Sequence, residues 1–162
     1  MDEIRNGNVI FVSTARSALG KACLRMLIDS LRTFGGEIGK STFWIFTPSP
    51  SVKAFNELEQ PGVQIFPLSI PETISHYLFA GKVSSCAQAE AMAVGKARSL
   101  VFIDPVCLVV NPPTLYDLGE AYDAALRPVH IRNVGLPVTA PLDLFWQGIY
   151  RAVGVQDIEM TV

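Results

Sequence analysis

Four short apolar runs alternate with helical segments over the first hundred residues, and this alternation limits the fold more than any other feature of the sequence. The runs are rich in β-branched and aromatic residues, which favours strands buried on both faces. They cover residues 8–13 (NVIFVS), 42–47 (TFWIFT), 63–68 (VQIFPL) and 100–103 (LVFI). Pro67, near the end of the third run, indicates a strand terminus or a strand at the sheet edge.

The spacing of apolar residues predicts helices between these strands and after them. The predicted helices cover residues 17–34, 51–60, 82–98, 114–126 and 141–153, with a further short strand at 128–132. On the first helix, the face predicted to be buried carries Leu19, Cys23, Met26, Leu27, Ser30 and Phe34.

The strand and helix order is β-α-β-α-β-α-β, which requires crossover helices. We therefore expect an α/β fold with three layers and a doubly wound, mostly parallel sheet. One domain is expected over residues 1–162, which is long enough for a sizeable core. The final residues, GVQDIEMTV, carry no stop signal, so the domain is expected either to end here or to be truncated at its C-terminus.

Composition narrows the class of protein further. Hydrophobic residues make up 49% of the chain and mean hydropathy is +0.32, yet no run reaches the ~20 residues of a membrane span. The N-terminus, MDEIRNGN, lacks the apolar core of a signal peptide, so we expect a cytoplasmic protein. A net charge of −2 without a basic stripe argues against nucleic acid as a partner. The 3 scattered cysteines fit reduced core thiols better than disulfides or zinc ligands.

The carboxyl ends of parallel strands share one edge of the sheet, where ligands bind. This rule places the turn after the first strand, residues 67–69 and the residue after the fourth strand on one rim. The turn and that last residue comprise Ser13, Thr14, Ala15, Arg16 and Asp104.

Two interpretations of the turn remain open. Its hydroxyls, backbone N–H groups and Arg16 could hold a uracil, ribose or phosphate. Alternatively, Ser13, Thr14 or Ser17 caps the following helix and Arg16 is solvated, which is the interpretation that the sequence alone favours.

Lys82 and Asp104 each have two interpretations as well. A lysine at the start of a helix opposes the helix dipole, which hints at an anionic partner, but many such lysines are simply surface residues. Asp104 precedes Pro105, and Asp-Pro at the end of a strand is a common turn signature. Asp104 is therefore either a turn residue or the remnant of a metal–phosphate site.

Other motifs fail on spacing or context. The segment GGEIGKST, residues 35–42, is one residue short of a phosphate-binding P-loop and stands between a helix and a strand, in the reverse order. We interpret it as a helix end and a loop. His76 and His130 have no close acidic neighbour in sequence, and His130 with Arg132 is as well explained by core or surface roles as by ligand contacts.

Three segments together resemble the nucleotide-binding half of GT-A type nucleotide-diphospho-sugar transferases, closest to the glycogenin-like group. NVIFVSTARSALGKACLRMLIDSLR is similar to that family's first strand, polar turn and helix. FAGKVSSCAQAEAMA resembles the lysine-led helix before its metal motif, and SLVFIDPVCLVVNPPTLYDL resembles its strand and D-x-D block. The likeness covers most of residues 8–118.

The resemblance implies roles for these residues. The turn at Ser13, Thr14, Ala15 and Arg16 would meet the base and ribose, Lys82 would face the diphosphate, and Asp104 would be the first Asp of D-x-D, bound to ribose or metal. The second Asp, which ligates Mn²⁺ or Mg²⁺ in the family, is Val106 here, so the motif is degenerate.

Three functions follow as alternatives. The first is an enzyme that transfers a hexosyl group from a nucleotide sugar, most naturally a UDP-sugar. The second is a non-catalytic GT-A-like scaffold or protein-interaction domain, which Val106 favours. The third is an unrelated α/β domain that binds another phosphorylated small molecule. The aromatic face of the last predicted helix, with Phe145, Trp146 and Tyr150, would serve either a homo-oligomer contact or, more commonly, packing on its own sheet.

Overall fold

A computed structural model of the chain describes residues 9–116, 118, 122, 124–125, 147–148 and 151. The chain divides into two compact units, residues 1–123 and residues 124–162. The first unit holds all the strands and helices named below. The predicted strand at 128–132 lies outside the described residues, as does most of the predicted helix at 141–153.

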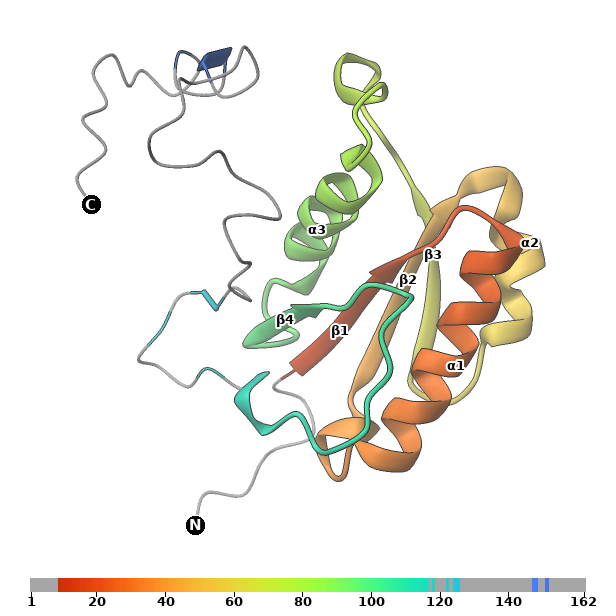
Figure 1. The fold of residues 1–162 in the computed structure, drawn as a ribbon, viewed down its shortest axis with the longest axis vertical. Helices are drawn as coiled ribbons and strands as arrows, with labels where there is room; N and C mark the ends of the chain where they lie inside the picture. The colour runs from red at the N-terminus through yellow and green to blue at the C-terminus, as the bar shows by residue number, and fades with distance from the viewer. Residues whose placement is uncertain are drawn as a thin grey trace, which may run out of the picture. The chain divides into compact units, whose positions relative to one another are not determined.

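Four parallel strands form the sheet at the centre of the first unit (Figure 1). They are β1 (Val9–Thr14), β2 (Thr42–Pro48), β3 (Val63–Leu68) and β4 (Ser99–Phe102), in the order β3-β2-β1-β4. Each starts or ends within one residue of the run that predicted it. Of the described strands, β3 lies at one edge of the sheet, which confirms the interpretation of Pro67.

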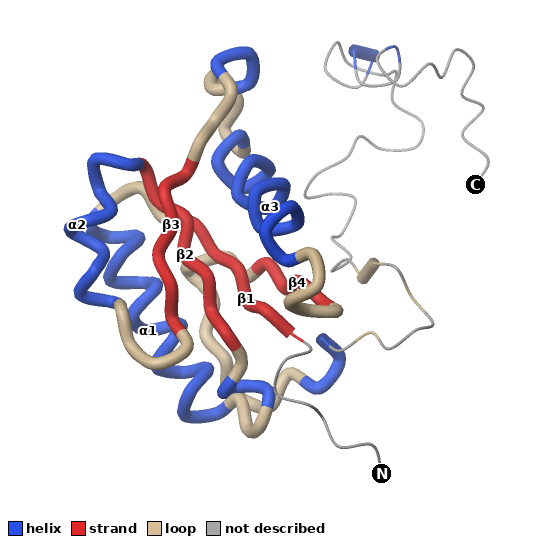
Figure 2. Tube along the Cα trace, turned by 180° about the vertical axis from the view of Figure 1, so that it is seen from behind, coloured by secondary structure: helices blue, strands red, loops and turns tan. Residues whose placement is uncertain are grey.

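Helices flank both faces of this sheet (Figure 2). The long helix α1 (Ala18–Phe34) and the short α2 (Val52–Phe55) pack on one face, and α3 (Ala80–Ala93) packs on the other. The predicted α/β class, the parallel sheet and the three layers are therefore confirmed. Of the described helices, none is long and apolar enough to span a membrane.

The α1 face of the sheet is packed with large side chains. Phe11 and Phe43 stack there with their ring centroids 6.2 Å apart, and both are fully buried. The helix contributes Leu24, Leu27, Ile28 and Leu31 to this layer. Loss of water contact by so much apolar surface is the main stabilising contribution to such a fold.

The predicted buried face of α1 is right only in part: Leu27 is buried, Cys23 and Ser30 are half-buried, and the other three residues are exposed. Leu19, Met26 and Phe34 are 75%, 58% and 51% exposed. The residues of α1 that face the sheet are Leu24, Leu27, Ile28 and Leu31. The helix has apolar residues around more than half of its circumference, so spacing alone did not fix the side that meets the sheet.

The third helix differs from its prediction at both ends. It begins at Ala80 rather than at Lys82, and it ends at Ala93 rather than at residue 98. Gly95 has a φ of 71°, in the left-handed region that stops a helix, although the alanine-rich sequence continues to Ala97. The segment predicted as a helix at 51–60 is one turn, α2, between two short 3₁₀ segments.

The segment resembling a P-loop is a helix end followed by a loop, as the sequence predicted. Gly35 donates its N–H to the Leu31 carbonyl at 2.8 Å and ends α1. Gly36 then adopts a φ of 61°, which a side chain would strain. The chain reaches β2 through a single 3₁₀ turn.

Candidate functional site

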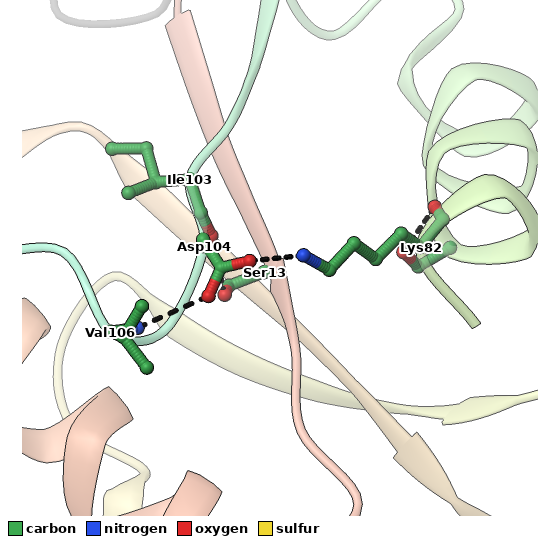
Figure 3. Close-up of polar contacts among 6 residues, drawn as sticks. Ser13, Lys82, Ile103, Asp104 and Val106 are labelled. Atoms are coloured by element: carbon green, nitrogen blue, oxygen red, sulfur yellow. Dashed lines mark hydrogen bonds and ion pairs between the residues drawn. The ribbon is translucent and has the colours of Figure 1, made fainter. Parts of the chain in front are cut away.

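The candidate site lies at the carboxyl ends of β1 and β4, which are neighbours in the sheet. Val12 pairs with Phe102, and the Ile103 N–H donates to the Val12 carbonyl at 2.9 Å. The turn after β1 and Asp104 after β4 are therefore brought together although they stand far apart in the sequence (Figure 3). The predicted rim is therefore formed by the ends of β1 and β4, whereas its third segment, residues 67–69, lies at the end of β3, which β2 separates from β1.

Two hydroxyls in the last two residues of β1, which were predicted to lie in the turn, tie the strand ends together. The Ser13 hydroxyl is fully buried and donates to the Ile103 carbonyl at 2.7 Å, across to the end of β4. The Thr14 hydroxyl donates to the Phe46 carbonyl at 2.9 Å, and the Ala15 N–H donates to the same oxygen at 3.2 Å. Both hydroxyls are buried and donate to backbone carbonyls, so they stabilise the strand ends and do not point toward a ligand.

Ser17 is the residue that caps α1, which confirms one of the capping alternatives. Its hydroxyl accepts the Gly20 N–H at 3.1 Å. Arg16, just before it, is exposed and lies alongside the first turn of α3, because a Cβ built on Gly81 would lie 3.8 Å from Arg16 Cδ. Arg16 is thus the side chain of this turn that can reach a ligand.

Lys82 and Asp104 form an ion pair between the first turn of α3 and the end of β4 (Figure 3). The Lys82 ammonium donates to Asp104 Oδ2, and the other carboxylate oxygen accepts the Val106 N–H at 3.3 Å. The Cys107 N–H donates to the Asp104 carbonyl at 2.9 Å, which closes a turn. Asp104 is therefore a turn residue and a charged partner of Lys82 at once.

The charge of Asp104 is stabilised in the fold. Partial burial raises the pKa of Asp104, but the hydrogen bonds from Lys82 and the Val106 N–H, with the Lys82 charge, outweigh it and hold the pKa below its ordinary value. The side chains of Lys82 and Asp104 are 41% and 32% exposed, so the pair is within reach of solvent and of a ligand.

Phe79 also contacts the Lys82 ammonium, which lies 5.6 Å from the centre of its ring. This aromatic residue immediately before α3 was missed in the sequence, because cation–π contacts have no fixed spacing. Gln88 was also missed, because its amide hydrogen-bonds the Ser69 backbone, which has no sequence signature; these bonds join the third predicted rim segment to α3.

The donor groups around Asp104 do not fit a divalent metal. Mn²⁺ and Mg²⁺ take several oxygen ligands, whereas Val106 supplies an apolar side chain that is 76% exposed. Within residues 9–116 and the few described beyond, no three His, Cys, Asp or Glu side chains are grouped to hold an ion. The single carboxylate present is already paired with Lys82.

Other predicted residues lie elsewhere. His76 packs on Tyr77, with ring centroids 4.3 Å apart, while His130 and Arg132 lie outside the described residues. A shallow pocket of about 170 Å³ lies between α1 and the segment after α2, and none of its lining residues belongs to the rim.

The fold and the rim define a Rossmann-like α/β unit with a four-stranded, all-parallel sheet and helices on both faces. Comparisons with known proteins add no family: no family model matches the chain, and no curated protein sequence matches it significantly.

Proposed function

We propose that this chain is a GT-A-like domain that binds a nucleotide-diphospho-sugar, most naturally a UDP-sugar, at the carboxyl ends of β1 and β4. The observation that carries the proposal is the Lys82–Asp104 ion pair, which joins the start of α3 to the end of β4 beside the turn after β1. These are the segments that the resemblance assigns to the diphosphate, the ribose and the base.

Charge supports a diphosphate as the ligand. Lys82 lies in the first turn of α3 and Arg16 lies beside that turn, while Asp104 contributes one negative charge, so these three side chains together carry a net positive charge. An anion placed near the beginning of a 14-residue helix is also favoured by the helix dipole. Parallel sheets bind ligands at this same edge.

Val106 favours binding without transfer as the second candidate function. A glycosyl transferase must stabilise the charge that develops on the departing diphosphate, and a metal ion is the usual means. Val106 removes a metal ligand, so a non-catalytic scaffold that retains its nucleotide is a coherent alternative to an enzyme.

Isothermal titration with UDP, UDP-glucose and GDP tests the proposal. We expect UDP and UDP-glucose to bind and Arg16→Gln to weaken both, since Arg16 is the exposed cation of the turn. Lys53→Gln, an exposed lysine on α2, is the matched control and should bind as the wild type does. Failure of all three nucleotides to bind would overturn the proposal.

Hydrolysis of UDP-glucose then separates the two candidates. Release of glucose or its transfer to an added acceptor would establish an enzyme. Binding of UDP-glucose with no turnover over prolonged incubation would support the scaffold.

A further inference from the structure

We infer that the Lys82 ammonium takes the place of a divalent cation at this rim, so that the chain binds a nucleotide diphosphate without metal. The inference rests on the proposed function and specifies how that site neutralises its ligand. It comes from the mismatch between the metal expected by resemblance and the groups that surround Asp104.

The ammonium is held in position from two sides. Asp104 accepts its hydrogen bond on one side, and the Phe79 ring lies 5.6 Å away on another. A lysine normally samples many rotamers, and fixing it before the ligand arrives removes part of the entropic cost of binding. With 41% of its side chain exposed, Lys82 still presents N–H donors to an incoming oxygen.

A metal ion would have to displace this ammonium. An ammonium already bound to Oδ2 repels a second cation at the same oxygen, and this repulsion is strongest where water is partly excluded. Oδ1 of Asp104 accepts the Val106 N–H at 3.3 Å, so a metal ion would compete with this hydrogen bond at Oδ1 and with Lys82 at Oδ2. One carboxylate is a poor substitute for the several oxygen ligands that Mn²⁺ or Mg²⁺ requires.

Asp104 has a different role in this arrangement. It is a positioning residue that fixes Lys82, instead of a ligand to an ion. The diphosphate meets the free side of the ammonium and the guanidinium of Arg16, a residue whose Cδ lies near Gly81 of the first turn of α3. Charge-assisted hydrogen bonds of this kind are stronger than neutral ones and are well suited to phosphate oxygens.

The test is titration of UDP at constant ionic strength, once with EDTA and once with Mn²⁺. The wild type should give the same Kd in both, within about twofold, and Lys82→Met should weaken binding by about tenfold or more in both. Lys82→Arg keeps the charge and should retain most of the affinity. Lys21→Met is the matched control, since Lys21 is also a first-turn helix lysine paired with a carboxylate.

Each result decides one question. Binding that appears only with Mn²⁺, or tightens by about tenfold with it, would overturn the inference and leave the proposed function standing. Equal affinity of Lys82→Met and wild type in EDTA would also overturn it. No binding of UDP under either condition would overturn the proposed function and this inference with it. The wild-type comparison needs no variant, so the test holds even if Lys82→Met does not fold.

Discussion

The two faces of the sheet are built from different kinds of side chain. On the α1 face, phenylalanine, leucine and isoleucine interlock, and the helix supplies four buried branched residues. On the α3 face, the sheet supplies Trp44 and Phe46 while the helix supplies small residues. The buried residues of α3 are Ala80, Gly81, Ser84, Ser85, Ala89 and Ala93.

This difference separates stability from positioning. Large interlocking side chains bury much apolar surface and stabilise the fold. Small side chains bury less, but they let the helix backbone approach the strands closely. The first turn of α3 can then bring Lys82 to the end of β4, so the less stabilising face is the one that carries the candidate site.

The largest expected effect comes from removing bulk on the α1 face. Leu27→Ala should lower the free energy of unfolding by about 2–5 kcal/mol, because a fully buried leucine leaves a cavity. Urea denaturation measures the loss. Leu19→Ala, at a position 75% exposed on the same helix, should cost about 0.5 kcal/mol or less. Similar losses at the two positions would show that the assigned face is wrong.

Adding bulk on the α3 face should have the next largest effect. Ala89 is fully buried, so Ala89→Leu should destabilise the fold by about 1–3 kcal/mol and also weaken UDP binding by displacing the helix that holds Lys82. Ala91→Leu, exposed on the same helix, should leave both nearly unchanged. Wild-type stability in Ala89→Leu would mean that α3 is not closely packed.

A smaller and pH-dependent effect is expected for Asp104→Asn. The pKa of Asp104 is lower in the fold than its ordinary value of 3.8, so the unfolded chain binds more protons as the pH falls past that value. The stabilisation is therefore complete above pH 3.8 and is lost as the pH falls through the lower folded pKa.

Near neutral pH, the free energy of unfolding of the wild type should exceed that of Asp104→Asn by less than about 1 kcal/mol, since both partners are partly exposed. Urea midpoints measured from neutral to acid pH should converge below the ordinary pKa. A gap that widens in acid would contradict the assigned ion pair.

The smallest effect is expected from breaking the ion pair of Lys21, the corresponding first-turn lysine of α1. Lys21 pairs with Glu57 at 3.0 Å, and the Glu57 side chain is 66% exposed. The hydrogen bond and the charge of Lys21 lower the pKa of Glu57, but solvent screens the pair. Glu57→Gln should leave the Tm unchanged within error in thermal melts. A loss greater than that of Asp104→Asn would reverse the ranking of the two pairs.

The strands were predictable because their signal is local. Runs such as VIFVS and TFWIFT combine apolar, β-branched and aromatic residues, and the turn residues around them set their ends. Helix orientation was less predictable. The apolar residues of α1 form two overlapping stripes, and only contact with the sheet selects the one that contains Leu24 and Leu31.

The site was predictable as a neighbourhood but not as a set of contacts. Parallel-strand topology placed Asp104 and the turn after β1 on one edge, and Lys82 was added from its place at a helix start and from the resemblance, yet the ion pair joins residues that are 22 positions apart. The Ser13 hydroxyl meets a backbone carbonyl 90 positions away, and a carbonyl has no sequence signature. Such contacts depend on the three-dimensional fold, not on any local pattern.

The strand order has a consequence for how the chain folds during synthesis. β1 can pair with β2, and β2 with β3, once residue 68 has left the ribosome, but the other side of β1 must wait for β4. Closing a connection of that length slows pairing, since distant contacts form only after the intervening chain is ordered. The Lys82–Asp104 pair is therefore assembled last, and a nascent chain halted before residue 99 would carry α1 and its core without the candidate site.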